Sequence, residues 1–320
     1  MLTAQQHLFA KFLTALLLLG GAGQGVVRAQ QDVAFAQYWL SSTQWNPAAV
    51  GRTPQLSING MLQSHAMGYE DAGSTMWAGA DMALQLGNTR HGVGASFLND
   101  RIGLFSHKRF ALQYAYHHKL WGGRLSWGAQ IDLLQEDIDG SKADFGTGSD
   151  PAFPSSQVSG SAVDFSGGLH YEHKGWQVAL AAQHLAAPTI SMGETHYYEV
   201  KRNFHLMGAY DLSLASPYYW LTPSVMLRSD LRDHRIDFTL RGTYRYEGRR
   251  IVAGLGYAPT RSLTAFVGGT LRGIDLCYSY EANTSGLGWG AGQHEISVAY
   301  RMDLNLGKRG RNLHKSVRWL

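Results

Sequence analysis

The residues from Arg235 to Tyr246 alternate between apolar and polar side chains. Successive side chains of a β-strand point to opposite faces, so this segment would have one apolar and one charged face. Glu295 to Leu304 repeats the pattern near the end of the chain. A soluble sheet rarely repeats it a dozen times with aromatic-rich outer faces. We therefore predict an all-β fold, a transmembrane outer-membrane β-barrel of about 14 antiparallel strands with lipid outside and polar groups within.

The amino-acid composition is typical of a chain with many strands joined by short turns. Aromatic residues make up 12% of the chain and charged residues 16%, and there are 38 Gly but only 8 Pro. The mean hydropathy of -0.21 does not exclude a membrane protein, because a barrel exposes only every second residue of a strand to lipid. With signal and tail set aside, the body holds slightly more acidic than basic residues, so its charge does not indicate nucleic-acid binding.

The two ends of the chain predict that the protein is exported, and they help to divide the chain into four regions. Lys11 precedes an apolar run, and Val27-Arg28-Ala29 forms a small-residue cleavage site, which is typical of a secretory signal. The single Cys, Cys277, excludes an internal disulfide framework. We expect a signal peptide at 1–29, a periplasmic or lumen segment at 30–55, the barrel at 56–304 and a basic periplasmic tail at 305–320.

The lengths of the predicted connections separate the two ends of the barrel. Four long connections follow the first, fifth, seventh and thirteenth predicted strands, at 66–74, 139–162, 186–199 and 282–293. Connections after even-numbered strands, such as Lys174-Gly175, are tight. Outer-membrane barrels have short periplasmic turns and longer external loops, so this sorting supports an even strand number.

Side-chain parity assigns the faces of the strands. Phe110, Leu112 and Tyr114 are expected outside, as are Val163 and Phe165. The inner faces mix positive and negative side chains with Ala and Gly. We therefore expect ion pairs and folded-in segments in the lumen rather than a wide pore of one charge.

The chain lacks the motifs of common active sites. There is no His-Glu-x-x-His, Gly-x-Ser-x-Gly, phosphate-binding Gly-rich loop or Cys-x-x-Cys. The acidic, Gly-rich run 136–150 resembles a calcium loop but fails its template, because Gly140 directly follows Asp139. We expect no enzymatic activity, no cofactor and no metal site, although a lipolytic barrel enzyme is a minor alternative.

Several short motifs follow one another along the mature chain. The mature chain opens with Asp32-Val33-Ala34-Phe35-Ala36-Gln37-Tyr38 and continues with Asn46-Pro47-Ala48-Ala49-Val50-Gly51. Further matches are Gly92-Val93-Gly94-Ala95-Ser96 with Asp100-Arg101-Ile102-Gly103, Asp150-Pro151-Ala152-Phe153-Pro154, and the closing His294-Glu295-Ile296-Ser297-Val298-Ala299-Tyr300. Together and in this order, these segments resemble the PorP/SprF family of type IX secretion system outer-membrane proteins. The basic extension after Asp303 is longer than the usual family ending.

The signal peptide predicts that the protein itself is exported through the general secretory route. The resemblance implies a barrel in the outer membrane of a Gram-negative cell that helps to export large proteins to the cell surface. Implied partners are secretion-system components, carboxy-terminal regions of secreted cargo such as gliding adhesins, and a peptidoglycan-binding periplasmic protein. The matching positions are Phe35, Gln37, Tyr38, Asn46, Pro47 and Gly51 in the first segments, and Asp150, Pro151, Phe153 and Pro154 in the longest loop.

Two roles stay open for the first group, locking the segment into the lumen or contacting cargo, and we favour locking. Prolines on both sides of Phe153 would hold an aromatic anchor for cargo or a partner at low entropic cost. The basic tail is either a solvated extension or a contact for anionic lipid, cell-wall polymer or a partner. The rival function is a passive outer-membrane porin or small-molecule channel.

Overall fold

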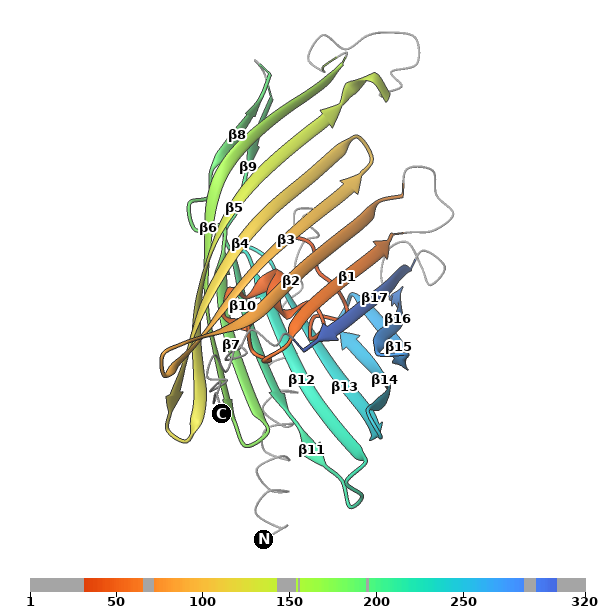
Figure 1. The fold of residues 1–320 in the computed structure, drawn as a ribbon. Helices are drawn as coiled ribbons and strands as arrows, with labels where there is room; N and C mark the ends of the chain where they lie inside the picture. The colour runs from red at the N-terminus through yellow and green to blue at the C-terminus, as the bar shows by residue number, and fades with distance from the viewer. Residues whose placement is uncertain are drawn as a thin grey trace, which may run out of the picture.

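The computed structural model describes residues 32–65, 72–142, 154, 156–193, 196–284 and 292–303. These residues form a closed antiparallel β-barrel of 14 strands, as predicted (Figure 1). Short helices, α2 (Ser42–Trp45) and η1 (Pro47–Ala49), lie before the first strand, and η2 (Gly140–Lys142) follows the fifth. No helix among the described residues has the length and apolar character to cross a membrane.

Seventeen strands follow one another along the described residues. The first seven are β1 (Leu56–Ser64), β2 (Ser74–Leu86), β3 (Thr89–Ile102), β4 (Phe105–Leu120), β5 (Gly123–Asp139), β6 (Gln157–His173) and β7 (Trp176–Gln183). The others are β8 (Thr189–Met192), β9 (His196–Glu199), β10 (Asn203–Tyr210), β11 (Leu212–Ser213), β12 (Tyr219–Ser229), β13 (His234–Tyr246), β14 (Arg249–Ala258), β15 (Ser262–Leu271), β16 (Ile274–Asn283) and β17 (Gln293–Met302).

The ring closes between the first and last strands. β1 pairs with both β2 and β17, and β10 pairs with both β7 and β12. The two-residue β11 continues the line of β10 and pairs with β12, so the two count as one barrel strand. The described wall therefore has no open edge, which is the condition for a sheet to cross hydrocarbon with its backbone groups paired.

Tight turns join strands at one end of the barrel. Four of them are two-residue turns whose residues both have positive φ, for example Lys174 at 47° and Gly175 at 88°. This conformation is the type I′ hairpin turn, whose twist matches that of the flanking strands. We call this the short-turn end. The four long connections leave from the opposite, long-loop end, because consecutive strands are antiparallel.

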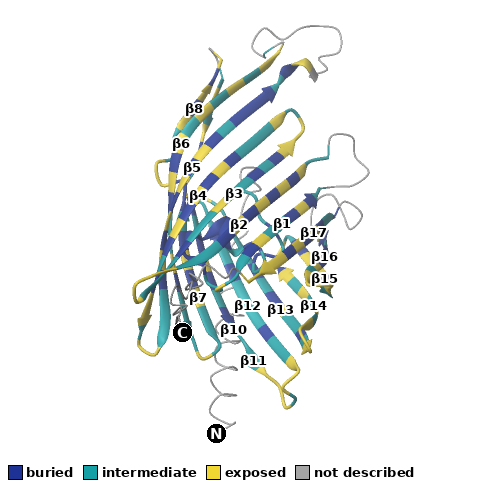
Figure 2. Ribbon diagram, in the orientation of Figure 1, coloured by how far each residue is buried: buried dark blue, intermediate teal, exposed yellow. Residues whose placement is uncertain are grey.

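Burial alternates along the strands as the sequence predicts. Figure 2 shows dark buried and yellow exposed residues in bands along the strands, most clearly on β2 and β5. On β4, Leu112 is 65% exposed while its neighbour Gln113 is buried, so Leu112 faces outward. The outward apolar residues of Phe110 to Tyr114 and of Val163 and Phe165 are confirmed.

The wall is uneven in height. β4, β5 and β6 have 16, 17 and 17 residues, whereas β14 to β17 have 10 each (Figure 1). β6 begins six residues before its predicted start, at Gln157. The exposed side chains at the start of β6 are Gln157, Ser159 and Ser161. They are polar, so this part of the strand lacks the alternation of apolar and polar residues by which the other strands were predicted.

A small hairpin covers the inner face of the tall wall. Residues 186–199, predicted only as a long connection, contain the paired strands β8 and β9. Ile190 and Met192 of β8 are buried against Leu134 and Ile138 of β5. The hairpin thus shields apolar side chains that the inner face of β5 presents at the long-loop end.

The outward face provides a test of membrane embedding. Leu112 lies at the middle of β4, so Leu112→Arg should place a charge near the centre of the lipid band and lower the free energy of unfolding by about 2–4 kcal/mol. Leu86→Arg, at the strand end beside the Gly87 turn, is the matched control and should cost about 0–1 kcal/mol. Urea unfolding in lipid vesicles measures both; equal costs would contradict the assignment.

Candidate functional site

Residues 32–54, which we call the lumen segment, lie within the ring of strands (Figure 1, red to orange). Their polar groups bond to side chains and carbonyls of β2, β4, β6, β12 and β17. These partners lie far apart in sequence and on opposite sides of the barrel. The segment is therefore held by the wall as a whole, not by one neighbouring hairpin.

Gln37 joins the lumen segment to the last two strands. Its Nε2 donates to Ser279 Oγ at 3.0 Å, and its Oε1 accepts from Ser297 Oγ at 2.8 Å. The buried Glu295 carboxylate accepts the backbone N–H groups of Ala36 and Gln37 at 2.9 and 3.0 Å. Gln37 therefore satisfies both ends of its amide inside the barrel, and Glu295 holds the adjoining backbone.

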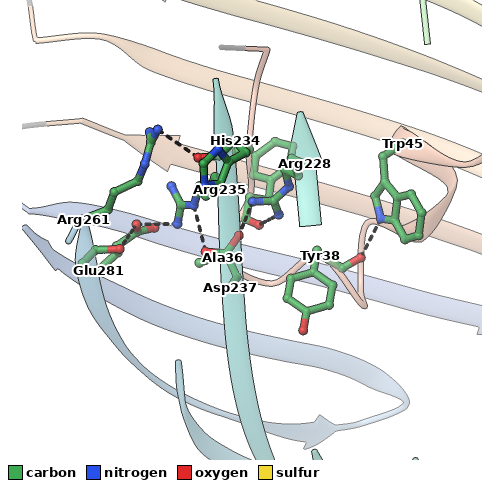
Figure 3. Close-up of polar contacts among 12 residues, drawn as sticks. Ala36, Tyr38, Trp45, Arg228, His234, Arg235, Asp237, Arg261 and Glu281 are labelled. Atoms are coloured by element: carbon green, nitrogen blue, oxygen red, sulfur yellow. Dashed lines mark hydrogen bonds and ion pairs between the residues drawn. The ribbon is translucent and has the colours of Figure 1, made fainter. Parts of the chain in front are cut away.

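Aromatic side chains anchor the segment on two sides. Phe35 packs with Met61, Trp77 and Leu98 of β1 to β3. Tyr38 belongs to a second apolar cluster, whose other members are Trp45, Ala179, Ala181, Met207, Ala209 and Met226. Its hydroxyl lies 2.7 Å from Ser224 Oγ, and its carbonyl accepts the Trp45 indole N–H at 3.1 Å (Figure 3). Small Ala side chains on β7 leave room for these rings.

Asn46 and Pro47 turn the segment as their sequence predicts. Asn46 Oδ1 accepts from the Ala48 N–H at 2.9 Å, and Pro47 occupies the first turn of η1, where its missing N–H costs nothing. Asn46 Nδ2 also donates to the Leu169 carbonyl of β6 at 3.0 Å. The Asn-Pro pair thus shapes the turn and binds it to the wall.

Glycines let the lumen segment touch the wall backbone to backbone. Gly51 has φ +67°, and its N–H donates to Asp81 Oδ2 at 2.8 Å. A Cβ on Gly92 of β3 would lie 2.2 Å from the Val50 carbonyl oxygen, and one on Gly128 of β5 would lie 2.4 Å from backbone atoms of Pro47 and Ala48. Glycine is required at these inward positions, since any side chain would meet backbone.

Wall residues bind the carbonyls of the helical turn. Gln44 O accepts from Arg109 Nη2 at 3.1 Å and from Gln183 Nε2 at 3.0 Å, and the Thr43 carbonyl accepts from Gln113. Sequence parity places Gln113 inside but could not name its partner. The signal available for the contact surface was the inward glycine, which in a strand marks a close backbone approach.

A buried chain of ion pairs lies on the opposite wall. Arg228 Nη1 contacts Asp237 Oδ2 at 2.6 Å, and Arg235 bridges Asp237 and Glu281 at 2.8 and 2.7 Å (Figure 3). Arg228 Nη2 also donates to the Phe35 carbonyl at 3.0 Å. The lumen therefore holds paired charges and a folded-in segment, as the mixed inner faces predict.

His184 fixes the start of the lumen segment. It follows β7 and lies between two carboxylates, 2.7 Å from Asp164 Oδ2 and 3.3 Å from Asp32 Oδ2. Burial alone would lower the pKa of His184, but the hydrogen bonds to Asp164 and Asp32 outweigh it and raise the pKa to about 9. Burial likewise opposes ionisation of Asp32, yet His184 and Arg109 hold its pKa below the usual range.

The predicted loop sites fall mostly beyond the described residues. Asp150, Pro151 and Phe153 lie outside them, as does the basic tail, and Pro154 is half-buried near Gly140. In the described part of run 136–150, Glu136 contacts His107 and Asp137 contacts Lys108 at 2.6 Å. No group of three or more His, Cys, Asp or Glu among the described residues could hold a metal ion.

A cavity lies on each side of the lumen segment. The larger, about 760 Å³, is at the short-turn end and is lined by Trp39, Arg52 and Lys174 among others. The smaller, about 480 Å³, is at the long-loop end and is lined by Asp32, Val33 and Tyr198 among others. Residues of the lumen segment thus form part of the lining of both cavities.

Comparison with known proteins identifies one family. Residues 27–300 match the family model described as "Type IX secretion system membrane protein PorP/SprF". The match spans the lumen segment and nearly the whole barrel. No curated protein matches the chain.

Solved barrels resemble the chain only distantly. A TodX monoaromatic hydrocarbon channel mutant has a TM-score of 0.49 at 12% identity, covering 83% of this chain and 94% of its own. The CymD monoaromatic hydrocarbon channel gives 0.48 at 12%, covering 87% and 95%. A Pseudomonas aeruginosa FadL homologue gives 0.49 at 11%, covering 81% and 92%.

The position of His184 predicts a pH-dependent anchor. A raised folded-state pKa means that protonated His184 stabilises the fold fully below about pH 6.5, its unfolded pKa, and that this stabilisation is lost as pH rises through about 9. His184→Gln should therefore lower the melting temperature near pH 6, and the difference from wild type should shrink above pH 9. A difference independent of pH would contradict the charged pairing.

Proposed function

Because the chain belongs to the PorP/SprF family of type IX secretion system membrane proteins, we propose that it is a plugged outer-membrane docking barrel of that system. In this role it binds or anchors secreted cargo, including gliding adhesins, or links machine components during export. The observation that carries the proposal is the lumen segment. Its buried polar contacts to opposite walls suit a rigid platform better than an open conduit.

The motif residues support a structural rather than a recognition role for the first segment. Phe35, Gln37, Tyr38, Asn46 and Pro47 are all buried, and their polar atoms bond to the barrel or to the segment itself. A cargo chain could not reach them without displacing the segment. We therefore assign these residues and Gly51 to locking the lumen segment, as a proposal that follows from their burial.

Cargo and partners would then meet the barrel at its two ends. We place the carboxy-terminal regions of cargo at the long-loop end, where the connection carrying Asp150, Pro151, Phe153 and Pro154 leaves the wall. Secretion-system components and a peptidoglycan-binding protein would meet the short-turn end and the tail at 305–320. Outer-membrane lipid surrounds the apolar outer face, and we expect neither an enzymatic activity nor a cofactor.

Conductance separates the plugged barrel from a passive porin. We expect full-length protein to give no steady current across a planar lipid bilayer. Gly128→Leu should place a side chain against Pro47 and Ala48, displace the lumen segment and produce measurable conductance. Gly208→Leu is the control, since a Cβ there lies 3.6 Å from one side-chain atom and meets no backbone.

Large steady currents through the unaltered protein would overturn the docking role in favour of a porin. A Gly128→Leu variant that is folded, as judged by its thermal unfolding, and stays silent would contradict the assignment of the lumen segment as the plug.

The role of the longest loop is tested by removing its aromatic anchor. Phe153→Ala should weaken capture of cargo from detergent-solubilised envelopes by about tenfold, because a rigid aromatic side chain at a contact centre commonly contributes 1–3 kcal/mol. Tyr197→Ala is the matched control, since Tyr197 is an exposed aromatic residue on β9 at the same end. Unchanged cargo recovery and surface retention in Phe153→Ala would remove this loop from the docking site.

A further inference from the structure

Four arginines lie together on the inner wall at the short-turn end. Arg241 and Arg245 lie on β13, Arg250 on β14 and Arg301 on β17, and all four line the larger cavity. We call them the arginine cluster. They face the same space as Trp39 and the other short-turn residues of the cavity.

The arginine cluster has fewer carboxylate partners than guanidinium groups. Arg250 and Arg301 share one partner, Asp275, at 2.9 and 2.8 Å. Arg241 lies over the Trp39 ring at 5.1 Å and Arg245 over the Trp220 ring at 5.3 Å, and neither forms an ion pair within the described part of the chain. Among the described residues, Asp275 is therefore the one carboxylate within ion-pair distance of the four guanidinium groups.

The remaining acids of the cavity already have partners. Glu172 pairs with Arg52 and Arg124. Asp81 accepts the Gly51 N–H, and Asp211 accepts the Thr222 hydroxyl at 2.6 Å. None of these carboxylates lies within ion-pair distance of the arginine cluster, and Asp211 and Asp81 attract Arg241 and Arg301 only at longer range. The cavity lining holds more basic than acidic side chains, so positive charge stays in excess there.

The register of the strands makes this arrangement costly without an anion. Arg245 and Arg250 are direct cross-strand partners of β13 and β14, and like charges in directly opposite positions destabilise a sheet. Further up the same wall, Arg228 and Arg235 are also opposite each other, but there Asp237 and Glu281 neutralise them. At the short-turn end only Arg250 of the opposite pair has a carboxylate partner, Asp275, and Arg245 has none within the described residues.

We propose that the cavity at the short-turn end is a binding site for an oxyanion group, carboxylate or phosphate. Planar guanidinium groups bind both chemistries through paired N–H donors, and the Trp39 and Trp220 rings hold two of them in place. Lys174 and Gly122 of the tight turns line the same cavity, so the ligand enters from that end. The site needs only the barrel and the lumen segment, so it depends neither on cargo binding nor on whether the barrel conducts.

The test is calorimetric titration of the full-length protein in detergent with two probes, inorganic pyrophosphate and citrate. The double variant Arg241→Gln/Arg245→Gln removes the two arginines that lack carboxylate partners. Arg249→Gln is the matched control, because Arg249 precedes Arg250 in the same strand and its exposed side chain points to the opposite face. We expect the double variant to bind at least about tenfold more weakly and the control to bind as wild type does.

The two probes distinguish the ligand chemistry. Binding of pyrophosphate alone assigns a phosphate group, binding of citrate alone assigns a carboxylate, and binding of both assigns a general oxyanion site. No binding of either probe to the wild type up to about 10 mM, weaker than any specific site of this kind, overturns the proposal. Equal loss in the double variant and in Arg249→Gln also overturns it, because attraction by overall charge would then suffice.

Thermal unfolding checks that the double variant is folded. Without a probe, the double variant should melt at the same temperature as wild type or higher, because repulsion within the cluster is relieved. Saturating probe should raise the melting temperature of wild type and Arg249→Gln but not that of the double variant. A lower melting temperature of the unliganded double variant would mean that the arginines stabilise the wall, and would contradict the inference.

Discussion

Closure of the strand ring is the constraint on which the rest of the structure depends. Backbone groups that face hydrocarbon find no water, so each strand must be paired on both sides, and the β1–β17 ladder completes that pairing. Once the ring closes, every strand has an inner face that lipid cannot cover. The polar and charged residues of those faces must then find partners inside the ring.

The lumen segment supplies many of those partners. Glu295, Gln113 and Arg109 each bond to its backbone, and inward glycines bring it against the wall. The segment and the wall thus satisfy each other's buried polar groups, which would be costly if left unpaired. The lumen segment could move only if its contacts to several strands broke at once.

This construction suits the docking role that we propose. The motif residues of the lumen segment are buried, so in that proposal partners would meet the barrel at its ends, each of which has a cavity. At the long-loop end the β8–β9 hairpin covers the tall wall, and at the short-turn end Arg241 and Arg245 line the cavity without an ion pair to the described residues. The two ends therefore differ in chemistry.

The sequence by itself predicted a barrel of about 14 strands, the sorting of its long connections to one end and the assignment of faces, because alternation and tight-turn residues are local signals. The β8–β9 hairpin and the start of β6 were not predicted, because the exposed residues of β8 and of the start of β6 are polar and give no hydrophobic pattern. Phe35 to Gly51 could be singled out as a locking segment, yet their partners could not be named. Only the tertiary structure decided that Gln37 meets Ser297, 260 residues away, because that contact depends on the register and closure of the entire ring.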